Sequence, residues 1–374
     1  MHSEEKQFVL LGLNLQELTS LTEKWEEKPY RARQLFEALY RQRIRTVEEI
    51  STVPHAFQKG LEDEGWCVGR PSIEKRFVSV DGTVRYLIGL ADSETVETVW
   101  MPEGDGTEVD EDDLAREGTR TRSWSRATIC VSSQVGCAVD CKFCLTAQLG
   151  VKRNLTAGEI VGQVLTVLSD QSVTVRKDRV NLVFMGMGEP FLNYDNFMKA
   201  VRILVEGVEI PAARMTVSTA GIVPRIHDFA MEKVRPRLAI SLNASNDEQR
   251  KDLMPINKKW NLAKLLESAR EFPLTRRECV TFEYVLLREV NDANDDANRV
   301  VDLLKGIRAK VNLIALNPGP GIDFETPQET RVLEFQRILI AAGIPTFIRR
   351  PRGRDIYAAC GQLKRTVDLV TITM

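Results

Sequence analysis

The chain has 374 residues, of which 43% are hydrophobic and 28% are charged, and its formal net charge is −2. This balance is typical of a globular protein with a large core, and it excludes a globally basic surface, so nucleic-acid binding would need a local basic patch. No apolar run approaches the ~18 residues of a membrane span, and no secretory signal is evident. We therefore predict a cytoplasmic protein that does not enter a membrane.

Seven cysteines and only three histidines restrict the chemistry. An odd number of cysteines without a secretory signal argues against a disulfide-stabilised scaffold. The histidines are His2, His55 and His227, which leaves few candidates for a catalytic triad or a multi-histidine zinc site. Demanding chemistry would have to use cysteines, carboxylates and a cofactor.

Residues 1–70 are predicted to form a helical N-terminal domain with an accessory or RNA-binding role. Asn14 and Glu17 have the spacing of a capping box, and apolar residues follow at helical intervals. Pro29 begins a second helix with a basic face, which fits either solvation or contact with phosphates. The candidate RNA contacts in this domain are Arg41, Arg43 and Arg45.

Residues 71–125 are predicted to be a β-rich linker followed by a flexible loop. Strand-like segments cover 74–80, 84–90 and 96–101, and an Asp-Gly turn joins the first two as a hairpin. Residues 103–125 contain few apolar side chains and an acidic run, which is typical of a surface loop.

Residues 126–350 alternate strand-like and helix-like segments, which predicts a parallel sheet covered by helices. Strands are expected at 127–132, 180–185, 215–219, 238–242, 280–287, 311–316 and 346–348. Helices are expected at 157–168, 194–204, 224–231, 262–271, 296–307 and 329–342. The number of units favours an α/β fold built as a partial (β/α)6 TIM-like barrel, with an open doubly wound sheet as the alternative. Residues 351–374 form a C-terminal segment.

The loop after the first of these strands carries Cys137, Cys141 and Cys144 at C-x3-C-x2-C spacing. Three thiolates on one tight loop can bind three irons of a [4Fe–4S] cluster and leave the fourth iron open for a chelating ligand. A zinc site would need a fourth nearby cysteine or histidine, and none follows at short spacing. Core burial of the three is disfavoured because Asp140 and Lys142 lie between them.

Small polar residues and glycines follow several of the other strands. The carboxyl ends of the strands in such a sheet meet at one mouth, where ligands bind, so these residues are expected to converge. Each alone is better explained as a turn or cap residue, but the set together at one mouth favours ligand binding. The set is Gly188, Glu189, Ser218, Ser241, Leu242, Asn243 and Asn317.

The cysteine triplet resembles the signature of the radical S-adenosylmethionine (radical SAM) superfamily, and residues 186–190 resemble its GGEP-like motif. Residues 128–155, 185–190, 253–257 and 358–363 together resemble the RlmN family of RNA adenine-C2 methyltransferases, and the resemblance spans nearly the whole chain. Asn243 departs from the family pattern, because many relatives have histidine at the matching position.

This resemblance implies one [4Fe–4S] cluster on the three cysteines and two SAM molecules per turnover, with the strand-end set binding SAM. It implies that Cys360 carries the methyl group as S-methylcysteine, that Cys130 resolves the intermediate by forming a disulfide with Cys360, and that Glu97 accepts a proton. The implied substrates are the peptidyl-transferase-centre adenine of 23S rRNA and an adenine of tRNA. The implied electron donor is flavodoxin with its reductase, and the protein is expected to be a monomer.

Three alternatives remain open at this point: a Cfr-like adenine-C8 methyltransferase, a radical SAM enzyme with another substrate, and a non-catalytic Fe–S or zinc RNA module. Glu94 and Glu103 compete with Glu97 as the proton acceptor. A second basic stretch precedes Cys360 and could hold phosphates while the target base is flipped. Its arginines are Arg349, Arg350, Arg352 and Arg354.

Overall fold

A computed structural model describes residues 8–103 and 124–363, so most of the predicted acidic loop and the end of the C-terminal segment lie outside the described residues. The N-terminal region is helical, as the sequence predicts. It contains β1 (Phe8–Val9), α1 (Leu15–Lys24), α2 (Tyr30–Glu37), the π-helix η1 (Ala38–Gln42), α3 (His55–Asp63) and β2 (Trp66–Cys67). The predicted capping box is present, because the Asn14 side chain accepts from the Glu17 backbone N–H at 2.9 Å and the Glu17 carboxylate accepts from that of Asn14 at 2.8 Å.

A ten-stranded sheet in the order β14-β13-β12-β11-β10-β9-β6-β5-β4-β3 forms the centre of the described chain. The seven strands from β14 to β6 run parallel and coincide with the predicted ones, which confirms the α/β barrel-type fold. They are β6 (Arg126–Cys130), β9 (Arg179–Phe184), β10 (Met215–Thr219), β11 (Arg237–Ser241), β12 (Val280–Leu286), β13 (Ala309–Ala315) and β14 (Thr346–Ile348).

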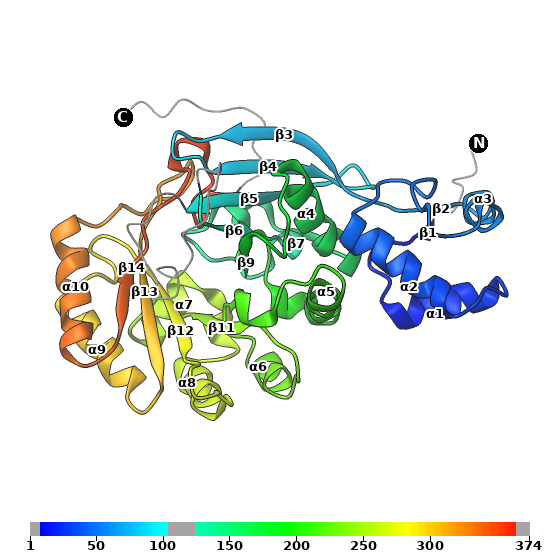
Figure 1. Ribbon diagram of the computed structural model, residues 1–374. Coiled ribbons are helices and arrows are strands. Elements are labelled where there is room, and N and C mark those ends of the chain that lie inside the picture. The colour runs from blue at the N-terminus through cyan, green and yellow to red at the C-terminus, as the bar shows by residue number, and fades with distance from the viewer. Residues whose placement is uncertain (1–7, 104–123, 364–374) are drawn as a thin grey trace.

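Helices cover one face of this curved sheet, and the N-terminal helices lie at one end of the molecule (Figure 1). Apolar side chains such as Ile240, Phe282 and Leu313 are fully buried. The α-helices are α4 (Ala157–Asp170), α5 (Tyr194–Glu206), α6 (Val223–Ala230), α7 (Asp247–Leu253), α8 (Leu262–Glu271), α9 (Asn294–Leu304) and α10 (Glu329–Ala341). Short elements at the loops are β7 (Gln134–Gly136), η2 (Leu145–Leu149), β8 (Val151–Asn154), η3 (Pro190–Asn193), η4 (Ala212–Arg214), η5 (Pro255–Lys258) and η6 (Arg354–Ile356).

The β-rich region expected as a linker continues the same sheet. Its strands β3 (Ser72–Val78), β4 (Val84–Gly89) and β5 (Thr95–Glu103) pair antiparallel in sequence order, and β5 pairs with β6. The pairing aligns Val99 with Cys130. This region therefore forms one wall of the sheet next to the strand that leads to the cysteine loop.

The face of the sheet opposite the helices carries most of the polar strand residues. Residues paired directly across neighbouring strands point to the same face, as do residues two apart along a strand. Following the pairing from β4 to β14 therefore identifies one continuous inner face. Its members include Arg85, Glu97, Cys130, Ser218, Ser241, Glu283, Asn312 and Phe347.

No helix within the described ranges is both long and apolar enough to span a membrane.

Candidate active site

The cysteine loop is held in place by backbone hydrogen bonds. The Cys137 N–H donates to the Gly150 carbonyl at 2.8 Å, and the Cys144 N–H donates to the Cys141 carbonyl at 3.1 Å. The chain reverses at Asp140, whose φ of 57° is in the left-handed region that asparagine and aspartate tolerate best. Local backbone hydrogen bonds thus position the loop that carries the three cysteines.

The three thiols lie in an apolar setting, packed against a cluster that includes Val139, Phe143 and Met254. Burial raises the pKa of Cys137 to about 12, and burial together with the neighbouring thiols raises the pKa of Cys141 well above its ordinary value. Three negative thiolates would be unfavourable here without a compensating positive centre. The donor set therefore fits a bound metal centre.

Three thiols on one loop fit a cluster whose fourth iron stays open for a ligand. Within residues 8–103 and 124–363, no three His, Cys, Asp or Glu side chains are placed so that they could hold one metal ion. A cluster makes a different demand, because each thiolate binds a different iron and the sulfurs need not meet at a point. Cys137, Cys141 and Cys144 are accordingly the residues that would hold a [4Fe–4S] cluster.

Cys130 and Cys360, which are far apart in the sequence, lie close enough for their charges to interact. Cys130 ends β6 and is buried, and burial first, then the negative charge of a Cys360 thiolate, raises its pKa. Part of Cys360 is exposed to solvent. Its thiol is nevertheless surrounded by protein, and this loss of hydration raises the pKa of Cys360 to about 11. Glu283 and Cys144 add to that shift, which places the Cys360 thiol near both the inner face and the cysteine loop.

The segment that carries Cys360 is docked onto the cysteine loop. The Leu145 N–H donates to the Gly361 carbonyl at 2.8 Å, and the Thr146 hydroxyl donates to the Leu363 carbonyl at 2.7 Å. The Asn317 amide donates to the Cys360 carbonyl at 3.2 Å. Asn317, expected to bind SAM, therefore also positions the backbone of Cys360.

Glu97 lies on the inner face, but it is fully buried and forms an ion pair with the equally buried Arg85. Its backbone carbonyl accepts from the Ser132 hydroxyl at 2.6 Å, which ties β5 to the loop after β6. Glu97 shares the sheet face with Cys130, since it lies two residues from Val99. The register thus brings together the two residues, although the carboxylate already has a charged partner.

The turn at Gly188 and Glu189 presents a buried carboxylate at the end of β9. Gly188 has a φ of 97°, and a Cβ there would meet the Gln134 backbone nitrogen at 2.7 Å, so glycine is required. The Glu189 carboxylate accepts from the backbone N–H groups of Ala220 at 2.6 Å and Phe191 at 3.0 Å. Burial nevertheless raises the pKa of Glu189 to about 7, so a nearby cation such as an ammonium group would stabilise the charged form.

The remaining strand-end residues lie at the ends of β10 and β11. The hydroxyls of Ser218 and Ser241 are 3.4 Å apart, which shows the two strand ends side by side. Leu242 is fully buried. The Asn243 side chain is engaged, because its oxygen accepts from the Val285 N–H at 2.9 Å and its nitrogen contacts the Met254 sulfur at 3.2 Å. Its backbone carbonyl also accepts from the Asn291 side-chain amide at 2.9 Å, so Asn243 mainly shapes the strand end.

Arg250, on α7, is a residue that the sequence analysis did not select. It is fully buried, and its guanidinium donates to the carbonyls of Ala220 at 2.7 Å, Ser241 at 3.0 Å and Leu242 at 3.0 Å. One side chain thus links the ends of β10 and β11 at the mouth of the barrel. An arginine four residues before Met254-Pro255 in a polar helix carries no sequence signal of burial, and only a family-wide comparison could have found it.

The two predicted groups of basic residues differ in whether their side chains already have partners within the protein. In the N-terminal domain, Arg43 donates to the Val173 carbonyl at 3.0 Å, and Arg41 forms an ion pair with Glu209 at 2.9 Å. Both side chains thus join this domain to the barrel, whereas Arg45 is exposed. The other group is the stretch before Cys360, which comprises Arg349, Arg350, Arg352 and Arg354. In the part of the chain that the structure describes, the side chains of these four arginines form no hydrogen bond or ion pair.

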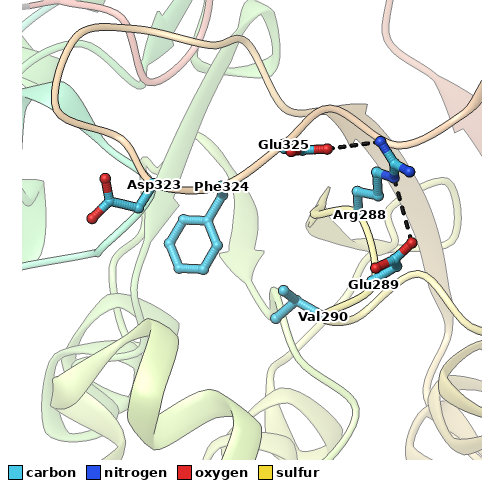
Figure 2. Close-up of a pocket in the computed structure, with 6 residues that line it drawn as sticks. All are labelled: Arg288, Glu289, Val290, Asp323, Phe324 and Glu325. Atoms are coloured by element: carbon cyan, nitrogen blue, oxygen red, sulfur yellow. Dashed lines mark hydrogen bonds and ion pairs between the residues drawn. The ribbon is translucent and has the colours of Figure 1, made fainter.

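A pocket of about 330 Å³ lies beside the mouth of the barrel, and Figure 2 shows the side chains that line it. Arg288 forms ion pairs there with Glu325 at 2.7 Å and with Glu289 at 3.6 Å. Asp323 adds a third carboxylate, so the lining is acidic and unsuited to a polyanion. None of the residues selected from the sequence lines this pocket.

Two family models match the chain. The model of the ribosomal RNA large subunit methyltransferase N-terminal domain matches residues 8–65, and that of the radical SAM superfamily matches residues 131–304. The matches cover the helical domain and the greater part of the parallel sheet with the cysteine loop. Both regions were recognised separately in the sequence.

Close relatives cover almost the whole chain. A protein of Koribacter versatilis (strain Ellin345), named probable dual-specificity RNA methyltransferase RlmN, is 62% identical over 94% of this chain and 100% of its own length. One of Syntrophobacter fumaroxidans, named dual-specificity RNA methyltransferase RlmN, is 44% identical over 90% of this chain and 92% of its own. The crystal structure of a radical SAM methyltransferase from Sphaerobacter thermophilus has a TM-score of 0.85 and 38% identity, covering 96% of this chain and 100% of that one.

Proposed function

The chain belongs to the RlmN family of radical SAM enzymes, and we propose on that premise that it methylates C2 of adenine in 23S rRNA and tRNA. Family membership implies a [4Fe–4S] cluster and SAM, for which the cysteine loop and the Gly188-Glu189 turn provide fitting residues. Bound together, the two would supply a 5′-deoxyadenosyl radical. The protein's own side chains then have to carry the methyl group, accept the proton and release the product.

Cys360 is the proposed methyl carrier. Adenine C2 lies between two ring nitrogens and is too electron-poor to take a methyl group from SAM by direct displacement. A cysteine sulfur can take it, with the thiol proton leaving and S-adenosylhomocysteine as the by-product. Hydrogen removal from the S-methyl group then gives a carbon-centred species that adds to C2 and links RNA and protein.

Cys130 is the proposed resolving thiol, and Glu97 is the proposed acceptor of the C2 proton. Once the adduct has lost the C2 proton to Glu97 and one electron, which would return to the cluster, Cys130 attacks the Cys360 sulfur. The S–S bond forms as the bond from this sulfur to the product carbon breaks, and that carbon takes up a proton. A reductant must then restore both thiols before the next turnover. The observation that supports this most strongly is the docking of the Cys360 segment onto the cysteine loop, which brings Cys360 within electrostatic reach of both Cys130 and Cys144. A radical SAM enzyme without a protein-bound methyl would not need that arrangement.

The direct experiment is mass spectrometry of adenines in 23S rRNA and tRNA after incubation with SAM, reductant and the anaerobically reconstituted protein. We expect 2-methyladenine in both RNAs. A product methylated at C8 would instead establish the Cfr-like alternative, and a colourless zinc-loaded protein without product would exclude radical chemistry.

Two cysteine variants test the mechanism within the same assay. Cys360→Ala should keep the cluster absorbance and SAM cleavage while losing all methyl transfer, because only the carrier is removed. Cys130→Ala should accumulate RNA covalently attached to Cys360, because the bond to the product carbon is no longer broken. Cys279→Ala is the matched control, since Cys279 is also partly buried but lies before β12, away from the mouth. Full RNA methylation by Cys360→Ala would refute the carrier role.

The proposal extends to the partners that the family implies. We propose that flavodoxin and its reductase deliver the electron, that the enzyme acts as a monomer in the cytoplasm, and that two SAM molecules are consumed per methyl group transferred. The ratio of 5′-deoxyadenosine to S-adenosylhomocysteine in a turnover assay tests the last point, and a one-to-one ratio is expected.

A further inference from the structure

The Asn312 side chain on β13 has an unused hydrogen-bond acceptor on the inner face. Asn312 is 2% exposed, and its amide nitrogen donates to the Glu283 carboxylate on β12 at 2.7 Å. Its amide oxygen has no hydrogen-bond partner within the described residues. Because a buried polar atom is normally paired, this oxygen is expected to meet a donor when a ligand is bound.

Phe347 is the direct neighbour of Asn312 on the edge strand β14, and the pairing places both side chains on the same face. Phe347 is 52% exposed, whereas Thr346, which points to the opposite face, is 4% exposed. A large aromatic ring is therefore left open at the edge of the inner face, next to the unpaired oxygen. A flat ligand with a donor group on its rim would use both.

The neighbouring residues place Asn312 and Phe347 near the proposed methyl carrier. Glu283, which holds Asn312, is the charged group with the largest effect on the Cys360 thiol, so the pair lies close to the proposed methyl carrier. Arg349 and Arg350 follow the end of β14 at Ile348 and are both exposed. Ring, acceptor, methyl carrier and phosphate-binding groups thus lie along one edge.

We propose that Asn312 and Phe347 bind the target adenine of the RNA, with the Asn312 oxygen accepting from the exocyclic amino group and the Phe347 ring stacking on the base. This inference rests on the proposed function and adds a selectivity determinant to it. Flipped bases are commonly held in this way, by stacking on an aromatic ring and by hydrogen bonds to the base edge. Guanine and hypoxanthine present a carbonyl where adenine has its amino group, so they would face the Asn312 oxygen with like polarity.

SAM also contains an adenine, but the location of most candidate SAM residues argues against SAM as the ligand of Asn312 and Phe347. The SAM candidates Glu189, Ser218 and Ser241 are on β9 to β11 or the turns that follow them. Asn317 follows β13, but its side-chain amide is already engaged with the Cys360 carbonyl. Asn312 and Phe347 lie on β13 and β14, and β14 is the edge strand at the parallel end of the sheet. A base that enters from solvent with its phosphates on the arginines reaches this edge first.

The test compares RNA hairpins that carry either adenine or unsubstituted purine at the target position, because purine lacks only the amino group. For the unaltered protein we expect weaker binding and slower methylation of the purine hairpin by about tenfold, the effect of one buried hydrogen bond. Asn312→Leu should bring the adenine hairpin down to the purine level and leave the purine hairpin unaffected. Phe347→Ala should weaken both hairpins alike, and Ile340→Ala, at an equally exposed residue on α10, should change neither.

Binding is measured by fluorescence anisotropy as well as turnover, so that the result does not depend on cluster loading. If Asn312→Leu still distinguishes adenine from purine by the full factor, the inference is overturned. It is also overturned if Asn312→Leu weakens SAM binding and RNA-free formation of 5′-deoxyadenosine while RNA binding stays unchanged, because the amide then serves the adenine of SAM. Absence of methylation by the unaltered protein would instead refute the proposed function itself.

Discussion

Arg85 on β4 and Glu97 on β5 form an ion pair in which both side chains are fully buried. The Arg85 guanidinium also lies over the Phe77 ring, 4.0 Å from its centroid. Removing two charges from water is costly, so each of these buried charges would be strongly unfavourable without the other. On the wall beside Cys130, it holds a carboxylate in a fixed place where the proposed chemistry needs a proton acceptor.

The first prediction is that Arg85→Met lowers the free energy of unfolding by about 3–5 kcal/mol, because Glu97 is left buried without its partner. Urea unfolding followed by circular dichroism measures the change. The double variant Arg85→Met with Glu97→Gln should recover much of the loss, because the second substitution removes the buried charge.

Arg202→Met is the matched control for this prediction. Arg202 pairs with Glu232 at 2.9 Å, but its side chain is half exposed, and exposed pairs contribute at most about 1 kcal/mol. Equal losses for Arg85→Met and Arg202→Met would contradict the argument from burial.

The second prediction concerns the reactivity of Cys360. Loss of hydration raises its pKa to about 11, so the thiolate is scarce at neutral pH. Because the thiolate is the nucleophile, alkylation of Cys360 in the cluster-free protein should accelerate about tenfold per pH unit from pH 7 to pH 10. Peptide mass spectrometry after timed iodoacetamide treatment gives the rate at each pH.

The smaller contribution of Glu283 to this pKa can be isolated with Glu283→Gln. Removing a neighbouring negative charge should lower the pKa of Cys360 and speed its alkylation at pH 8. Glu289→Gln is the control, because Glu289 is largely exposed on the loop after β12 and carries the same charge. An alkylation rate that rises no further above pH 8.5 would show that the pKa of Cys360 is not raised.

The sequence predicted the parallel strands and their helices because periodic apolar segments and short polar connections are local signals. It also selected the five cysteines of the proposed chemistry, through the triplet spacing and a resemblance to a family. It did not predict that β5 would pair with β6, and hence that Glu97 would share a face with Cys130. That relation depends on strand order, which no local pattern specifies.

Side-chain partners were equally beyond the sequence. Arg43 reads as one more exposed arginine, yet it donates to Val173, a residue 130 positions away. Arg250 reads as part of a charged helix, yet it is buried at the ends of two strands. Whether a charged side chain faces solvent or a set of carbonyl groups is decided by tertiary packing, and composition alone does not distinguish the two cases.

The third prediction is that Arg250→Lys disrupts the SAM end of the site. Lysine cannot reach the three carbonyl oxygens at once, so two or more buried acceptors lose their donor at a cost of about 1–3 kcal/mol each. We expect a lower free energy of unfolding by about 2–5 kcal/mol and weaker SAM binding in equilibrium dialysis. Arg270→Lys serves as the control, because Arg270 donates to the Leu303 carbonyl at 3.2 Å on the protein surface. Unchanged SAM affinity in Arg250→Lys would show that the strand ends do not depend on it.

The fourth prediction addresses the arginines after β14. Arg350 and Arg352 have no hydrogen bond or ion pair within the described chain, so their guanidinium groups are available for phosphates. Arg350→Ala with Arg352→Ala should weaken RNA binding and reduce the slope of log affinity against log salt by about 1.4–1.8, which corresponds to two phosphate contacts.

The matched comparison is Arg41→Ala with Arg43→Ala in the N-terminal domain, where the side chains contact Glu209 and Val173. Because these arginines already have partners within the protein, their loss should lower the stability more than it lowers the salt slope. Anisotropy titrations of a labelled tRNA at several salt concentrations give both slopes. If the first pair leaves the slope unchanged while the second reduces it, the RNA backbone is held by the N-terminal domain, and the edge of β14 is not the phosphate-binding side of the site.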